Sequence, residues 1–265
     1  MKIQQVIDYL NTLYPLAYQE DYDNAGHKVG DAGNDLTGIL VTLDVTDRTI
    51  DEALALGYNL IVSHHPMIFG GLKSLVPRTV QTQMLTRLIK NDICVYSAHT
   101  NLDNLPGGVS HILGEKLGLH SLRTLKPLAG WQRDGGQEPG GGAIGEFDRP
   151  MEYAAFMELV KRTLGLPVVR CSLNPPAAVK RVALCGGSGS FLIDEAASQK
   201  ADIFMTADIK YHDFQKAEGL VHLAYIGHYE SEQFARELIY NDIIKKFSNF
   251  ACRIAEGGNS YINYI

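Results

Sequence analysis

Two adjacent histidines, His64 and His65, are the residue types in this sequence best suited to chemistry. They follow the apolar segment 60–63, which has the character of a β-strand, and they precede Pro66, which ends regular structure. Consecutive strand residues point to opposite faces, so both imidazoles can serve one site only where the strand has ended. Taken alone, the pair fits a metal site and fits equally well one core histidine beside one solvated histidine.

A second pair, His228 and Glu232, lies in the segment GHYESE near the C-terminus. His228 ends an expected strand, and Glu232 follows four residues later in the first turn of an expected helix. Residues four apart project from one face of a helix, so the imidazole and the carboxylate can converge on one point. In isolation such a pair is more typical of a surface hydrogen bond. Glu230 should face elsewhere on the helix and be solvated.

The segments that must position these residues alternate between strands and helices. Buried strands are expected at 38–44, 60–63 and 93–98, with helices at 46–56 and 77–91. Such alternation predicts βαβ units and a parallel sheet, in which ligands bind beyond the carboxyl ends of the strands.

Polar residues follow all three strands at that end. Asp44 follows the first strand, the two histidines follow the second, and His99 and Asp103 follow the third. Three such coincidences favour one site. The polar segment 18–31, which includes Asp23, is expected to be a solvent loop.

The α/β alternation restarts after residue 150, so the sequence predicts two lobes. Residues 1–125 should form a first lobe that carries His64, His65 and Asp103, and residues 126–265 a second lobe that carries His228 and Glu232. The glycine-rich segment 129–147 between them is expected to be a flexible loop or hairpin tip, with a lid as an alternative. The expected elements of the second lobe are helix 151–164, strand 168–173, strand 179–185, helix 191–199, strand 202–208, helix 209–218, strand 220–228 and helix 229–247.

One strand-to-helix turn of the second lobe contains the sequence CGGSGS. Gly187 and Gly189 match the first part of a dinucleotide fingerprint, but Leu192 stands where its third glycine belongs. Free backbone N–H groups in this turn could contact a phosphate. A simple tight turn is the favoured interpretation.

Composition excludes several classes of function. The chain has 265 residues and a formal net charge of -6, so it has no broad basic field to concentrate it on nucleic acid or on an anionic membrane. It shows neither a signal peptide nor a membrane-spanning apolar run. Its four cysteines are scattered through apolar stretches, as in reduced cytosolic proteins. A cytoplasmic location is therefore expected.

Three histidines and two carboxylates form the candidate ligand set. Imidazole and carboxylate ligands suit zinc, iron or manganese. Five protein ligands exceed what one catalytic zinc normally takes and fit two ions, which can activate water for hydrolysis. The set comprises His64, His65, Asp103, His228 and Glu232.

Four blocks of the sequence resemble the signature of a known family. SHHPMIFGGLKSL, AHTNLDN, TADIKYHD and GHYESE look like those of the dinuclear metal-centre family of GTP cyclohydrolase I type 2 homologues, also called the NGG1-interacting-factor-three-like family. The resemblance implies a two-lobed α/β protomer with mostly parallel sheets, a toroidal homohexamer, and two divalent metal ions per subunit in the cleft between the lobes. It selects the same five ligands, with Glu232 bridging, and makes His99 and His212 candidates for proton transfer.

The leading hypothesis is therefore a metal-dependent hydrolase that acts on a nucleotide. If the substrate is GTP, activated water attacks C8 of the guanine, the imidazole ring opens and formate is lost. Two alternatives stay open: a non-catalytic metal-binding or regulatory scaffold, and a phosphoester hydrolase that uses the same two metals.

Overall fold

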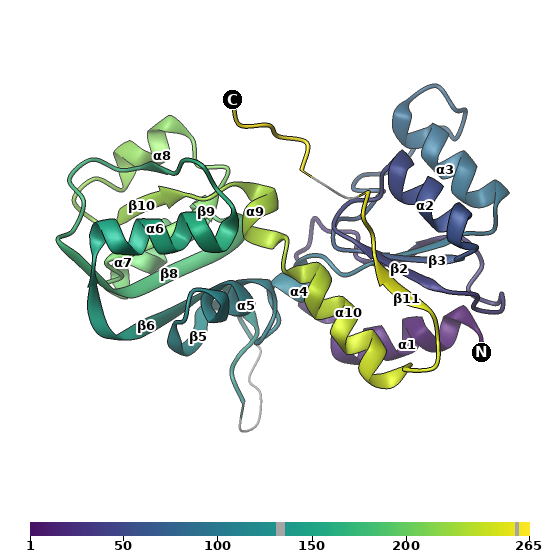
Figure 1. Ribbon diagram of the computed structural model, residues 1–265, viewed down its shortest axis with the longest axis horizontal. Coiled ribbons are helices and arrows are strands. Elements are labelled where there is room, and N and C mark those ends of the chain that lie inside the picture. Colours follow the sequence, from purple (N-terminus) through teal and green to yellow (C-terminus); the bar gives the residue numbers. More distant parts are fainter. Residues whose placement is uncertain (131–135, 258–259) are drawn as a thin grey trace. The chain divides into compact units, whose positions relative to one another are not determined.

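The computed structural model describes residues 1–130, 136–257 and 260–265, which divide into two compact units (Figure 1). Unit 1 comprises Met1–Leu102 and Ala235–Tyr261, and unit 2 comprises Asp103–Phe234 and Ile262–Ile265. This division differs from the expected boundary at residue 125. The chain leaves unit 1 before Asp103, and its last long helix returns to the first sheet.

The sheet of unit 1 has the strand order β1-β4-β3-β2-β11. Its three central strands are parallel neighbours and fully buried, because helices cover both faces of the sheet. The register pairs Thr42 with Ser63 and Ser63 with Ser97, so these strands end level with one another. The strands are β1 (Gly26–Val29), β2 (Ile39–Thr42), β3 (Leu60–Ser63), β4 (Cys94–Ser97) and β11 (Cys252–Ile254).

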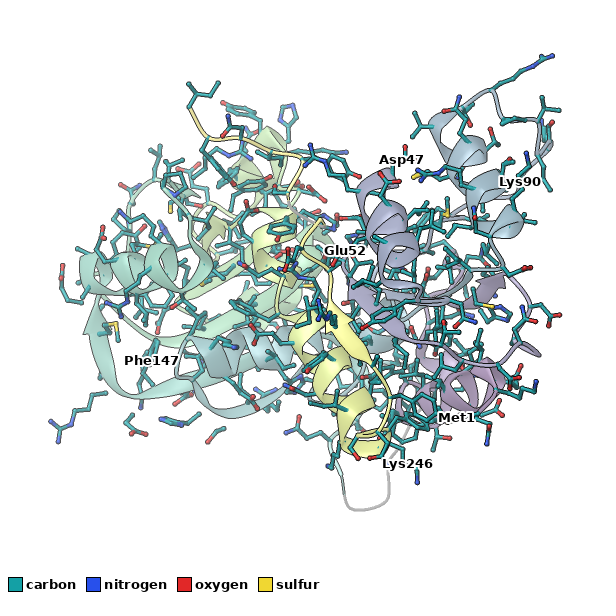
Figure 2. All side chains as sticks on the ribbon, turned by 45° about the vertical axis from the view of Figure 1, so that its right-hand side comes forward. Met1, Asp47, Glu52, Lys90, Phe147 and Lys246 are labelled. Atoms are coloured by element: carbon teal, nitrogen blue, oxygen red, sulfur yellow. The ribbon has the colours of Figure 1, made fainter. Side chains whose placement is uncertain are left out.

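Local signals fix the helices between these strands. The Thr46 hydroxyl accepts a hydrogen bond from the Thr49 N–H at 3.1 Å, which starts α2 (Asp47–Leu56), and Gly57 ends it with φ of +70°. Thr79 caps α3 (Val80–Lys90) in the same way. Figure 2 labels the first residue of α2, Asp47, and the last residue of α3, Lys90. The remaining long helices of unit 1 are α1 (Ile3–Leu13) and α10 (Ala235–Lys246).

The sheet of unit 2 is mixed, with the strand order β5-β6-β8-β9-β10-β7. Only β8–β9 and β9–β10 pair in parallel among its described strands, because β5 and β6 form an antiparallel pair at one edge and β7 closes the other. The expected α/β class, with two sheets flanked by helices, is confirmed. The expectation of mostly parallel sheets holds for unit 1 and is wrong for unit 2, where the hairpin β5–β6 and the strand β7 add antiparallel pairings. The strands are β5 (His120–Pro127), β6 (Gly140–Glu152), β7 (Arg170–Cys171), β8 (Ala178–Ser188), β9 (Ile203–Ala207) and β10 (His222–Tyr225).

Helices cover this sheet over two apolar clusters. Alternate residues of β8 enter different clusters, Val182 beside the α6 residue Phe156 and Ala183 beside the α7 residue Ile193. Phe156 also meets Phe147 edge-on, with ring centroids 6.0 Å apart. The helices of unit 2 are α5 (Val109–Lys116), α6 (Tyr153–Leu164), α7 (Ile193–Ser198), α8 (Tyr211–Lys216), α9 (His228–Glu232) and the 3-10 turn Ser190–Leu192. Unit 1 also contains the 3-10 turn Leu16–Tyr18, and the short helix α4 (Thr100–Asp103) lies at the boundary between the units.

Three further sequence expectations need correction. The segment 18–31, expected to be a solvent loop, contains β1. The glycine-rich segment 129–147 is not simply a loop, because residues 140–147 belong to β6; residues 131–135 lie outside the described part. The single helix expected at 229–247 is two helices, α9 and α10, and the boundary between the units falls between them. No helix in the described residues is long and apolar enough to cross a membrane.

The glycines of β6 serve close packing. A Cβ at Gly140 would lie 2.1 Å from the carbonyl oxygen of Lys126 in β5. We expect Gly140→Ala to lower the free energy of unfolding by about 2 kcal/mol, because the strands must separate. Gly71→Ala, whose Cβ would meet nothing within 4 Å, is the control. Calorimetric unfolding of both variants measures the difference, and equal stabilities would show that β5 moves freely.

Candidate metal centre

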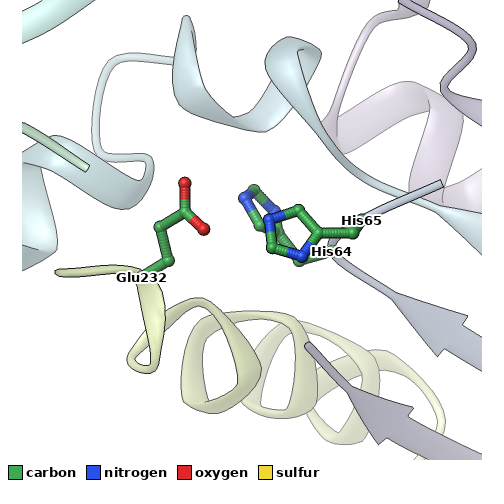
Figure 3. Close-up of side chains that lie close together, drawn as sticks. All are labelled: His64, His65 and Glu232. Carbon is green, nitrogen blue, oxygen red and sulfur yellow. The ribbon is translucent and has the colours of Figure 1, made fainter. Parts of the chain in front are cut away.

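His64 and His65 directly follow β3, and their backbone is hydrogen-bonded to the residue that follows β2. Their backbone N–H groups both donate to the carbonyl oxygen of Leu43, at 3.2 and 2.9 Å. The Ser63 hydroxyl donates to the His65 carbonyl at 2.8 Å, which stabilises the turn. The two imidazole rings consequently lie together, with centroids 4.9 Å apart and planes tilted by 48° (Figure 3). Their side chains do not diverge into core and solvent.

Each of the two imidazoles is oriented through Nδ1. His64 Nδ1 donates to the carbonyl oxygen of Ala98 at 2.7 Å, and His65 Nδ1 donates to Asp44 Oδ1 at 2.8 Å. With the proton on Nδ1, the lone pair lies on Nε2, and this tautomer binds a metal through Nε2. Asp44, at the end of β2, therefore has the role of a partner carboxylate.

His99 joins this group as a third imidazole. Its ring centroid lies 5.4 Å from that of His64 and 5.5 Å from that of His65. Its Nδ1 donates to Asp23 Oδ1 at 2.8 Å. Asp23 also accepts hydrogen bonds from the N–H and hydroxyl of Thr100. Burial raises the pKa of Asp23, but the bonds from His99 and Thr100 outweigh it and lower that pKa to about 2.

Unit 2 brings His228 and Glu232 together as the i, i+4 spacing predicts. His228 Nε2 lies 3.1 Å from Glu232 Oε2, and His228 Nδ1 donates to Asp208 Oδ2 at 2.8 Å. The Ser188 hydroxyl donates to the same Asp208 oxygen. Burial raises the pKa of Asp208, but the bonds from Ser188 and His228 outweigh it, so the pKa lies below its ordinary value. An ionised Asp208 orients His228 as Asp44 orients His65.

The glycine turn after β8 makes room for Glu232. A Cβ at Gly187, where φ is +61°, would lie 2.1 Å from Glu232 Oε1. The N–H of Gly186 donates to the Ser110 hydroxyl at 3.2 Å, and that of Gly187 donates to the Ser231 hydroxyl at 2.9 Å. Two of the donors that a phosphate would need are therefore already used. The glycine turn therefore makes space for the carboxylate of Glu232, which differs from the phosphate contact that the sequence suggested.

Asp103 belongs to unit 2 with Glu232, whereas the sequence placed it in the first lobe. Burial and then the negative charges of these two carboxylates raise the pKa of the Cys185 thiol. Both carboxylates therefore lie close enough to Cys185 to act on it. At neutral pH Cys185 is therefore a neutral thiol in this structure.

Two residues differ from the environment that the sequence suggested. Glu230 is 6% exposed and accepts a hydrogen bond from the Tyr264 hydroxyl at 3.1 Å, so the prediction that it is solvated was wrong. The helix α9 is therefore buried on the face that carries Glu230 as well as on the face that carries Glu232. His212 is exposed on α8, where its Nδ1 lies 3.3 Å from Gln215 Oε1.

The described residues suited to holding a metal ion include His64, His65 and Glu232 (Figure 3). Two imidazole nitrogens and a carboxylate oxygen are ligands for zinc, iron and manganese. The fold and these groups define a mixed α/β protein with side chains suited to a divalent metal.

Comparison with known proteins identifies the family. The sequence pattern of Duf34/NIF3 (NGG1p interacting factor 3) matches residues 1–256, and the chain belongs to this family. A Clostridium perfringens protein named GTP cyclohydrolase 1 type 2 homolog is 34% identical over 237 residues, covering 88% of this chain and 87% of the relative. A Lactococcus lactis protein of the same name is 34% identical over 215 residues, covering 80% and 79%.

Solved structures show the same fold. The Staphylococcus aureus protein SA1388 superposes with a TM-score of 0.89 at 29% identity, covering 100% of this chain and 99% of that one. A Bacillus cereus protein related to NIF3 superposes with a TM-score of 0.92 at 22% identity, with the same coverage.

The Asp23 carboxylate gives a pH-dependent contribution to stability. Its pKa in the folded state, about 2, lies below the ordinary 3.8, so ionised Asp23 stabilises the fold above about pH 4. About 2 kcal/mol should be lost as the pH falls from 4 to 2. Denaturant unfolding across this range should show a shallower loss for Asp23→Asn than for wild type. The exposed neighbour Asp21 provides the control Asp21→Asn, which should follow wild type.

Proposed function

We propose that this protein is a dinuclear metal-dependent hydrolase, similar to GTP cyclohydrolase 1 type 2, that acts on a nucleotide such as GTP. The observation that carries the proposal is the shared orientation of His64, His65 and His228, each of which donates Nδ1–H to an oxygen. Such partners are typical of metal-ligating histidines. The names of the relatives support the nucleotide substrate.

The proposed ligands are the five residues selected from the sequence: His64, His65, Asp103, His228 and Glu232. They would hold two divalent ions per subunit, zinc, iron or manganese, with Glu232 bridging. His228 Nε2 and Glu232 Oε2 lie 3.1 Å apart, which is close enough for both atoms to bind one ion. When bound, the ions supply an activated water at near-neutral pH.

His99 is the favoured group for proton transfer. The ionised carboxylate of Asp23 holds the proton on His99 Nδ1, which leaves Nε2 as the base. The ring lies next to those of His64 and His65. His212 is the second candidate, and its exposed position on α8 makes it a matched comparison.

The family resemblance also supports a cytoplasmic, toroidal homohexamer. Light scattering would measure the mass of this assembly.

Metal analysis followed by turnover assays tests the proposal. We expect two ions per subunit and, for one of the zinc, iron or manganese forms, formate released from GTP. Glu232→Gln should abolish formate release, whereas Glu218→Gln, at an exposed position on unit 2, should not. Phosphate release in place of formate would favour the phosphoester hydrolase. Two bound ions without turnover of any nucleotide would favour the scaffold.

Gly187→Ala tests the ligand role of Glu232 without changing a ligand. The added Cβ would displace Glu232 Oε1, so we expect less than two ions per folded subunit. Gly165→Ala introduces an equally unfavourable φ, +72°, where a Cβ meets nothing within 4 Å. It should retain both ions. Metal content measured on folded, size-fractionated protein separates the two effects, and full occupancy in Gly187→Ala would contradict the assignment.

His99→Gln should lower kcat by about 100-fold or more with metal content unchanged, because it removes a proton acceptor and no ligand. His212→Gln is the comparison. Steady-state kinetics at saturating GTP, with metal analysis of the same samples, measures the effect. An unchanged kcat in His99→Gln together with a large loss in His212→Gln would reverse the assignment.

A further inference from the structure

Unit 1 exposes two aromatic side chains next to His99. Phe69 is 51% exposed and Tyr22 is 63% exposed. The Phe69 ring meets the His99 ring edge-on, with centroids 5.9 Å apart, and the Tyr22 ring lies 6.2 Å from Phe69 at a tilt of 36°. Ring contacts therefore connect the exposed pair to His99 and, through it, to His64 and His65. Exposed apolar groups that adjoin a reactive site are typical of binding surfaces.

The backbone beside Phe69 is anchored. The Asn24 side-chain amide donates to the Ile68 carbonyl at 2.7 Å, and the Gln81 amide donates to the Met67 carbonyl at 2.7 Å. The side chains of Met67 and Ile68 pack against the core of unit 1, as does that of Leu72 after the two glycines. The residues before and after Phe69 are therefore anchored, and they hold its ring at the surface.

We propose that Phe69, with Tyr22 beside it, is the platform on which the flat base of a nucleotide stacks, so that one edge of the base faces His99. This inference rests on the proposed function, since it assigns a subsite of the same centre. A planar heteroaromatic ring gains dispersion and quadrupole contacts on an aromatic face that a sugar or a phosphate cannot gain.

The charge of the segment favours a phosphorylated ligand. The Phe69 segment, residues 66–80, includes two cations, Lys73 and Arg78, and no acidic residue, whereas acidic residues flank Tyr22 on both sides. A locally positive segment attracts an anion in an otherwise acidic protein. A nucleotide combines an aromatic base with phosphate groups, so it matches both the aromatic pair and the positive segment.

Binding measurements on the full chain test the platform. Calorimetric titration of the metal-loaded protein with guanosine and GMP should give dissociation constants about tenfold higher for Phe69→Ala than for wild type. Ribose 5-phosphate, which has no base, should bind both proteins equally. Phe69→Tyr should restore wild-type affinity, because it keeps the aromatic face. Val80→Ala, which shortens a 65% exposed side chain on α3, is the matched control and should change nothing.

Turnover gives a second readout. A platform that holds ground state and transition state equally should raise KM for GTP about tenfold in Phe69→Ala and leave kcat unchanged. Formate release with an unchanged KM in that variant would overturn the platform and leave the hydrolase intact. Phe69-dependent binding of guanosine without formate release would support the platform and count against the hydrolase. Wild-type protein that binds no nucleoside would overturn the platform.

Discussion

The parallel register of β2, β3 and β4 is the constraint on which the centre in unit 1 depends. Because Thr42, Ser63 and Ser97 lie side by side, the three strands end level. The residues that follow them meet at one edge of the sheet, as expected for the carboxyl ends of parallel strands. A shift of β3 by a single residue would separate His65 Nδ1 from Asp44 and His64 Nδ1 from its carbonyl partner.

One arrangement recurs in both units: an oxygen from a neighbouring segment holds an imidazole by its Nδ1. The partner is a backbone carbonyl for His64 and a carboxylate for His65, His99 and His228. Each partner fixes the orientation of its ring and the nitrogen that carries the proton. Ser188 adds a further donor, which stabilises Asp208 in its ionised form.

The sequence predicted what depends on local pattern. Strand ends, helix caps and the i, i+4 pair of His228 and Glu232 follow from spacing within a few residues, and the structure has them. Contacts over long sequence separations had no local signal. Asp23 holds His99 across 76 residues, and Glu230 is buried through a bond to Tyr264, 34 residues later. Glycine content likewise suggested a loop where β6 needs close strand packing.

The interleaved order of the units has a consequence for synthesis of the chain. Every described strand of the sheet in unit 2 precedes residue 226, whereas β11, which pairs with β2 in unit 1, is Cys252–Ile254. Until that strand emerges from the ribosome, one side of β2 has no strand partner, and an unpaired strand edge is prone to pair with other chains. The sheet of unit 2 can therefore form earlier in translation, whereas that of unit 1 is complete only after residues 252–254 have been made.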